Sequence, residues 1–274
     1  MTQRTVAEFL TPAGFAPPSL AAVLREARVL REAGHYAART AGQRRMARRT
    51  PYAGRLVPRA AEPVLLVPGF MAGDATLRPM ARSLQREGFR TYDSQIRANV
   101  GCTQAAMARL EERLEDIAHH RDSRVRIVGH SLGGVFGRAL AVRRPDLVSG
   151  VVTMGSPVLA PGAHHATLAR TVDVLVRLNR AGLAALMAED CVAGECAREG
   201  FGQARHPIPD DVALTAIYSR RDGIVDWRAC VDPEAESVEV TASHVGMAMD
   251  SQVIAAVVHA LRSTPRTAEV AAAV

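Results

Sequence analysis

Residues 125–134 decide the fold, and they read Val-Arg-Ile-Val-Gly-His-Ser-Leu-Gly-Gly. The apolar run at their start predicts a buried strand, and residues 134–144 favour a helix. Between the two lies a Gly-x-Ser-x-Gly pattern, in the strand–turn–helix setting of a nucleophile elbow. A turn this sharp leaves no room for side chains at Gly129 and Gly133. It presents Ser131 at the carboxyl end of the strand, so Ser131 is the candidate nucleophile.

Outward from this stretch, short apolar segments alternate with amphipathic ones. The predicted strands are residues 64–67, 89–96, 125–128, 148–154, 214–218 and 238–240. The predicted helices are residues 77–87, 104–118, 134–144 and 251–261. This alternation predicts an α/β fold, with a mostly parallel sheet of about six strands and helices on both faces.

Residues 158–210 interrupt the alternation, because they separate two strands by much more than a normal crossover. A helical apolar run, residues 165–187, lies inside this segment. We interpret residues 158–210 as a helical lid. Its candidate substrate-pocket residues are Leu168, Val172, Leu175 and Val176.

Two further candidates for the chemistry lie downstream of Ser131, each on a loop that follows a predicted strand. They are Asp222 and His244. A serine hydroxyl needs a base to take its proton, and the base needs an acid that orients it. A sheet that presents a nucleophile elbow has its nucleophile, acid and histidine in this chain order. We therefore predict His244 as the base and Asp222 as its acid, whereas Asp226 is expected to cap a short segment.

The tetrahedral intermediate of such a reaction needs backbone N–H donors near its oxyanion. Leu132 directly follows the candidate nucleophile and supplies the first. Phe70 follows Pro68 and Gly69 at the end of the first strand of the predicted sheet, and we predict its N–H as the second.

Taken together, these motifs resemble the α/β-hydrolases, in particular bacterial lipases and esterases, over about residues 63–261. The resemblance rests on Val-Pro-Gly-Phe at 67–70, Gly-His-Ser-Leu-Gly-Gly at 129–134, Gly-Ser-Pro at 155–157, Tyr-Ser-Arg-Arg-Asp-Gly at 218–223 and Ser-His-Val-Gly at 243–246. It implies a Ser–Asp–His triad, no cofactor, and a variable cap before the acid. Pro68 departs from the pattern, since many lipases have His there. The helical N-terminal part also departs from larger members, which have two antiparallel strands there.

The leading functional expectation is a serine hydrolase that cleaves small-molecule carboxylic esters, with neither cofactor nor metal. The apolar lid favours lipid-like acyl groups. An acyltransferase or a thioesterase would use the same residues and differ in what resolves or forms the acyl-enzyme. A non-catalytic binding module is a weaker alternative, because it need not keep Ser131, Asp222 and His244 together.

Residues 1–62 are predicted to form an Arg-rich segment ahead of the hydrolase domain, residues 63–274. The chain has a net charge of +6, and its first 63 residues alone carry +7. A basic arm can contact an anionic membrane surface, but a solvated helical face is the interpretation that we prefer. Nucleic-acid binding is not expected, because aromatic residues are not interleaved with the arginines. We expect residues 1–50 to be dispensable for the chemistry.

Within that segment, the spacing of apolar residues predicts a helix that begins after Ser19 and ends at Gly34. A linker is predicted over residues 51–63, where three prolines fall.

The four cysteines are Cys102, Cys191, Cys196 and Cys230. No signal-peptide pattern opens the chain, and no apolar run has the length of a membrane span. We therefore expect a cytoplasmic protein with free thiols. Cys191 and Cys196 are close enough in sequence to pair, and Cys230 is a candidate to join them. Their spacing does not match a zinc site with histidine partners.

Overall fold

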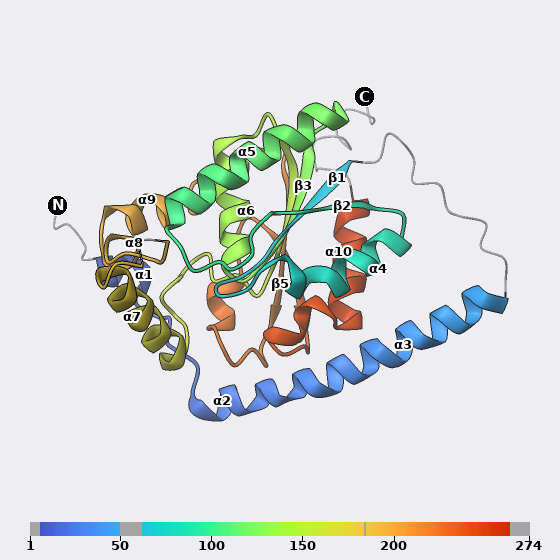
Figure 1. Cartoon of the computed structure of the whole chain (residues 1–274), viewed down its shortest axis with the longest axis horizontal. Coiled ribbons are helices and arrows are strands. Elements are labelled where there is room, and N and C mark those ends of the chain that lie inside the picture. The colour runs from blue at the N-terminus through green and yellow to red at the C-terminus, as the bar shows by residue number, and fades with distance from the viewer. Residues whose placement is uncertain (1–5, 50–61, 184, 264–274) are drawn as a thin grey trace.

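The computed structural model describes residues 6–49, 62–183 and 185–263, and its centre is a six-stranded sheet (Figure 1). The strand order is β2-β1-β3-β4-β5-β6, and every neighbouring pair is parallel. The strands are β1 (Pro63–Val67), β2 (Arg90–Asp93), β3 (Val125–His130), β4 (Val148–Met154), β5 (Ala213–Ser219) and β6 (Glu236–Val240). The predicted parallel sheet of about six strands is confirmed.

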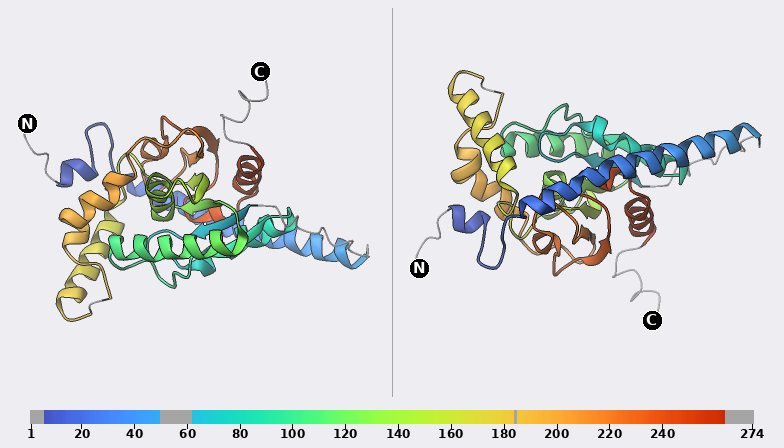
Figure 2. Two further views of the ribbon diagram at one scale, coloured as in Figure 1. Left: turned by 90° about the horizontal axis from the view of Figure 1, so that it is seen from above. Right: turned by 90° about the horizontal axis from the view of Figure 1, so that it is seen from below.

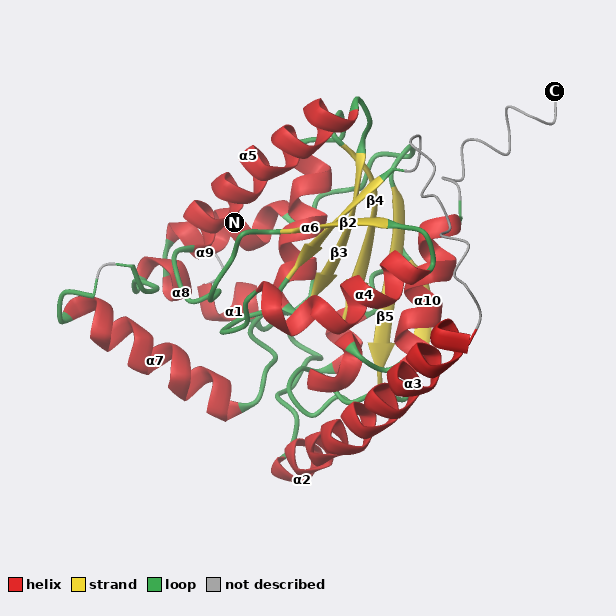
Figure 3. Cartoon of the chain, turned by 45° about the vertical axis from the view of Figure 1, so that its right-hand side comes forward, coloured by secondary structure: helices red, strands yellow, loops and turns green. Residues whose placement is uncertain are grey.

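Helices cover both faces of this sheet (Figure 3). One face packs against α5 (Thr103–Arg121) and α6 (Leu132–Arg143), and the other against α4 (Arg78–Arg86) and α10 (Ser251–Arg262). Strands buried on both faces read as continuous apolar runs rather than as alternating ones. All residues of β1 and β4 are accordingly buried. The described residues also form four short 3₁₀ helices: η1 (Arg25–Arg28), η2 (Asp74–Leu77), η3 (Trp227–Cys230) and η4 (Val245–Ala248).

Strand β2 is shorter than the predicted strand at residues 89–96. The N–H and the hydroxyl of Ser94 both donate to Asp74 Oδ1, at 3.1 and 2.6 Å. These bonds to a side chain from η2 replace the pairing that the sheet would give, so the chain leaves the sheet after Asp93.

The insertion between β4 and β5 contains α7 (Ala166–Arg180), α8 (Asp190–Ala193) and α9 (Glu195–Gln203). The helical run predicted for residues 165–187 is therefore wrong at its carboxyl end. The first helix stops at Arg180, because Gly182 has a φ of +106° and turns the chain out of the helix. Figure 3 shows α7 standing away from the sheet. A lid function for the insertion stays a prediction.

The N-terminal segment forms α1 (Val6–Leu10), α2 (Leu20–Leu24), η1 and the long α3 (Val29–Arg49). Ser19 caps α2, as predicted, by accepting the Ala22 N–H. The predicted single helix is instead divided into α2, η1 and α3, and α3 continues through Gly34. One glycine inside a helix costs only about 1 kcal/mol, and the alanine and arginine residues that follow it are strong helix formers. Figure 2 shows α3 running along one side of the molecule and extending past it.

Nearly all of the linker predicted for residues 51–63 lies outside the described residues. Among the helices that the structure does describe, none combines the length and the hydropathy needed to cross a bilayer.

Candidate active site

Ser131 occupies the turn that joins β3 to α6, with φ 53° and ψ −124°. Few residues other than glycine adopt such a conformation, which is typical of strained functional positions. A β-carbon at Gly129 would lie 2.4 Å from Gly134 Cα, and one at Gly133 would lie 2.2 Å from the Val67 carbonyl oxygen. The predicted need for two glycines is confirmed, and the turn they permit brings Ser131 to the carboxyl edge of the sheet.

Asp222 and His244 meet at the same edge, on the loops after β5 and β6. Asp222 Oδ2 lies 2.6 Å from His244 Nδ1, and both side chains are almost completely buried. The other carboxylate oxygen accepts the N–H groups of Ile224 and Val225, at 2.8 and 2.9 Å. These two bonds fix the carboxylate, so it holds the histidine ring in one orientation.

The electrostatic surroundings of His244 favour its protonated form. Burial alone lowers the pKa of a histidine. Here the charge and the hydrogen bond of Asp222, together with the charge of Glu26, outweigh burial and raise the pKa of His244 above its ordinary value. An imidazolium that forms at His244 during a reaction is therefore stabilised.

Asp226, four residues after Asp222, has other partners. Its carboxylate caps η3 by accepting the Arg228 N–H, and it also pairs with the Arg228 guanidinium. It further accepts the Ala16 N–H at 3.0 Å. The predicted capping role of Asp226 is confirmed, and of these two aspartates it is Asp222 that contacts the histidine.

His130 bonds to the backbone of the loop that carries His244. Its Nε2 lies 2.9 Å from the His244 carbonyl oxygen, and the two rings are 4.9 Å apart. A carbonyl only accepts, so Nε2 carries the proton and donates. Burial, together with the charge of the nearby His244, lowers the pKa of His130 to about 3 and keeps its ring neutral. The sequence pattern gave no sign of this role, because His130 is a variable position of Gly-x-Ser-x-Gly.

Two buried glutamates from the N-terminal helices hold the loops of Asp222 and His244. Glu26 Oε1 accepts the N–H groups of Gly223 and His244, at 2.8 and 3.0 Å, and its Oε2 accepts that of Val245 at 3.1 Å. Glu32 accepts the N–H of Ser243 at 2.9 Å and also its hydroxyl.

The hydrogen bonds of Glu26 change what we expect of the N-terminal segment. The sequence predicts that residues 1–50 are dispensable for the chemistry, because none of the triad candidates lies there. In the structure, Glu26 bonds to both loops that present the histidine and its acid. The signal in the sequence is two acidic residues, Glu26 and Glu32, in an otherwise Arg-rich stretch, and it does not identify their partners.

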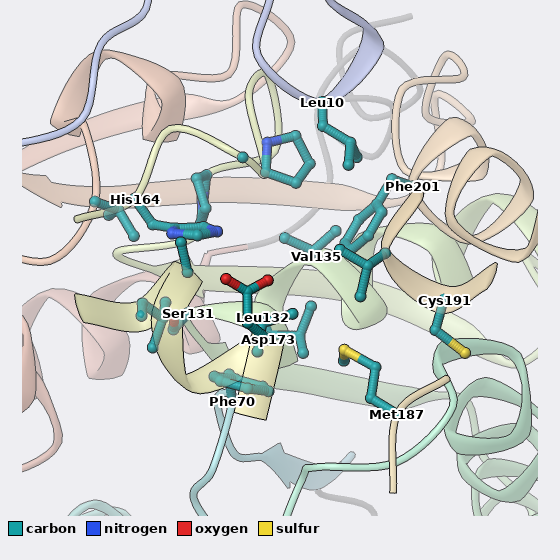
Figure 4. A pocket seen from close by; sticks show the side chains of 18 residues that line it. Leu10, Phe70, Ser131, Leu132, Val135, His164, Asp173, Met187, Cys191 and Phe201 are labelled. Atoms are coloured by element: carbon teal, nitrogen blue, oxygen red, sulfur yellow. The ribbon is translucent and has the colours of Figure 1, made fainter. Parts of the chain in front are cut away.

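A cavity of about 180 Å³ opens beside Ser131, and Figure 4 shows Ser131, Leu132 and Phe70 gathered at one end of it. Most of its wall is apolar and comes from several elements. The apolar side chains include Leu10, Phe70, Leu132, Val135, Leu168, Val172, Met187, Phe201 and Val225. Leu10 belongs to α1, so the N-terminal segment contributes to the cavity as well.

The predicted oxyanion donors are the backbone N–H groups of two residues that line this cavity, Phe70 and Leu132. Within the described residues, neither makes a hydrogen bond to another protein group. Unpaired N–H groups beside a serine are the arrangement that an oxyanion requires.

Two of the four candidate pocket residues on α7 do not line the cavity. Leu168 and Val172 do, whereas Leu175 and Val176 lie outside it. All four residues were predicted to line the pocket because all four are apolar. A helix rises 1.5 Å per residue, so Leu175 lies about 10 Å further along α7 than Leu168, past the cavity. Two polar residues that the sequence analysis did not propose, His164 and Asp173, complete the wall beside them.

Comparison with known proteins identifies the architecture. Residues 62–185 match the family model described as the alpha/beta hydrolase fold. The mature Bacillus licheniformis lipase BlEst2 superposes with a TM-score of 0.59 at 15% identity, covering 77% of this chain and 96% of that one. The metagenomic carboxyl esterase MGS0156 gives 0.54 at 18% identity, covering 70% and 67%. The Paleococcus ferrophilus monoacylglycerol lipase gives 0.51 at 16%, covering 73% and 93%. No curated protein sequence matches significantly.

Proposed function

Since the chain belongs to the α/β-hydrolase superfamily, we propose that it is a serine hydrolase of carboxylic esters. Ser131 is the nucleophile, His244 the general base, and Asp222 the acid that orients the base. The observation that carries the proposal is the 2.6 Å contact between Asp222 and His244, at the sheet edge where the strained turn presents Ser131. The esterase and lipase neighbours share the fold and agree with this activity.

The proposed reaction uses these three side chains. His244 Nε2 takes the proton of the Ser131 hydroxyl as its oxygen attacks the ester carbonyl. The N–H groups of Phe70 and Leu132 stabilise the negative charge on the carbonyl oxygen. The alcohol leaves with the proton from His244, and an acyl-enzyme remains on Ser131. Water then gives a proton to His244 and releases the acid by the same steps.

The cavity supports an apolar acyl group as the substrate part that binds there. Its wall is mainly aliphatic and aromatic, and a small set of polar groups stands near Ser131. Two exposed apolar side chains, Met71 and Val245, directly follow Phe70 and His244 in the sequence. A lipid-like ester therefore fits these surroundings better than a small polar one.

A panel of p-nitrophenyl esters of increasing acyl length, measured beside matched thioesters, tests this function. We expect kcat/KM to rise from acetate to longer chains, and oxygen esters to be preferred. Val172→Trp, which fills the cavity, should lower kcat/KM for the long esters by about 10–100-fold and change acetate little.

Leu175→Trp is the matched control, because Leu175 lies on the same helix outside the cavity. It should leave the chain-length preference unchanged. A preference for thioesters, or equal effects of both tryptophans, would count against an ester hydrolase with its acyl site here.

The Glu26 contacts predict an effect of the N-terminal segment on the chemistry. In Glu26→Gln the negative charge that raises the pKa of His244 is lost. His244 then stays neutral to lower pH, so the acid limb of kcat/KM should shift to lower pH. Glu26→Ala should show the same shift. It should also lose about 3 kcal/mol of unfolding free energy, because three N–H groups, two buried and one partly buried, lose their acceptor.

Glu32→Gln is the control for a merely structural effect. Glu32 contacts Ser243 and makes no bond to His244. It should lower stability without moving the acid limb. If the limb stays in place in both Glu26 variants, Glu26 acts on folding alone.

A further inference from the structure

Three of the four cysteines converge where the insertion meets the sheet domain. Cys196 Sγ lies 3.6 Å from Cys102 Sγ and 3.6 Å from Cys191 Sγ, and the three sulfurs all lie within 4.8 Å of one another. All are free thiols. The candidate third member was Cys230, but Cys230 is buried in η3 and lies outside this group. Cys102, 94 residues from Cys196 in sequence, takes that place.

The surrounding backbone holds the three sulfurs in position. Asp190 accepts the N–H groups of Glu195 and Cys196, and these bonds fix the turn between α8 and α9. This turn keeps the side chains of Cys191 and Cys196 next to each other. Helix α9 also packs closely on the start of α5, beside Cys102. A β-carbon at Gly200 in α9 would lie only 2.7 Å from Thr103 Cγ2.

We propose that Cys102, Cys191 and Cys196 form a binding site for a thiophilic d¹⁰ cation, such as zinc, cadmium or monovalent copper. Metal–sulfur bonds of about 2.3 Å place the sulfurs of a tetrahedral or trigonal site ~3.8–4.0 Å apart. The observed separations need only small adjustments to reach these values. Among the described residues, no histidine or carboxylate joins the group, and soft sulfur donors select such cations over magnesium or calcium.

Binding is a proton exchange and involves no redox step. Each thiol that becomes a ligand loses its proton to the solvent, and a sulfur–metal bond forms in place of the S–H bond. Zinc would complete its coordination with water. A disulfide, by contrast, would use only two of the three sulfurs and would need an oxidant.

The site would connect the insertion to the sheet domain. Cys102 precedes α5, whereas Cys191 and Cys196 belong to α8 and α9. Cys191 also lines the cavity, and Figure 4 shows it with Met187 at the end away from Ser131. A bound cation would therefore hold this wall of the cavity in place.

The test is an anaerobic titration of the full chain, reduced with a phosphine and freed of metal by a chelator. Cadmium is the main probe, because its thiolate complexes absorb in the ultraviolet, and zinc is run in parallel. We expect one cadmium per chain, a thiolate-to-cadmium absorption band, and a rise in Tm with either ion.

Cys102→Ser is the informative variant, because Cys102 is the N-cap of α5 and serine is favoured at that position. It should fold normally, and it should lose the absorption band and the rise in Tm. Cys230→Ser removes a thiol outside the group and should retain both. Absence of binding to the reduced protein, or equal binding by both variants, would overturn the proposal.

Discussion

Replacing Ser131 by alanine should lower kcat for ester hydrolysis by about 10⁶-fold, the size of effect seen when a serine nucleophile is removed. The acyl-enzyme forms on this hydroxyl. Without the hydroxyl, the protein cannot form that covalent intermediate. The variant should also fail to react with an organophosphonate that labels the wild-type protein. Both losses are measured by steady-state kinetics and by mass spectrometry of the intact chain.

The fold should be unaffected, because the Ser131 hydroxyl makes no hydrogen bond to another described residue. Equal circular dichroism and Tm would establish this. Ser149→Ala, on β4, is the matched serine control. Within the described part of the chain, the buried Ser149 hydroxyl has no hydrogen-bond partner, so its removal should leave both activity and labelling intact. Ester turnover that survives in Ser131→Ala would end the proposed mechanism.

Asp222→Asn should lower kcat by about 10⁴-fold while the protein stays folded. An amide at this position can donate to His244 Nδ1, which favours the tautomer that cannot accept the serine proton. The negative charge is lost as well, and that charge raises the pKa of His244. The acid limb of the residual activity should therefore move to lower pH, as measured by kcat/KM against pH.

Asp226→Asn is the matched control four residues away. It weakens a cap on η3 and an ion pair with the half-exposed Arg228. We expect a loss of about 1 kcal/mol of stability and near-normal kcat. Reversed phenotypes for the two variants would assign the acid to Asp226 and contradict the contact that the structure shows.

In the N-terminal helices, local sequence patterns predict a helix cap but do not predict long-range hydrogen bonds. Ser19 was recognised as a cap, because capping depends on the three residues that follow it. The sequence does not identify Glu26 and Glu32 as partners of the His244 loop, because their bonds join residues 197–219 positions apart. The same reason explains Cys102, which no spacing rule connects to Cys191 and Cys196.

By itself, the sequence determined the parallel sheet, the strand–turn–helix unit around Ser131, and the loops that carry Asp222 and His244. These features follow from hydrophobic periodicity and from the steric demands of single turns, which act over a few neighbouring residues. Only the tertiary structure decided which N-terminal carboxylates bond to the histidine loop, which α7 residues face the cavity, and which three thiols converge. Those outcomes depend on packing between segments far apart in the chain, and local periodicity carries no record of that packing.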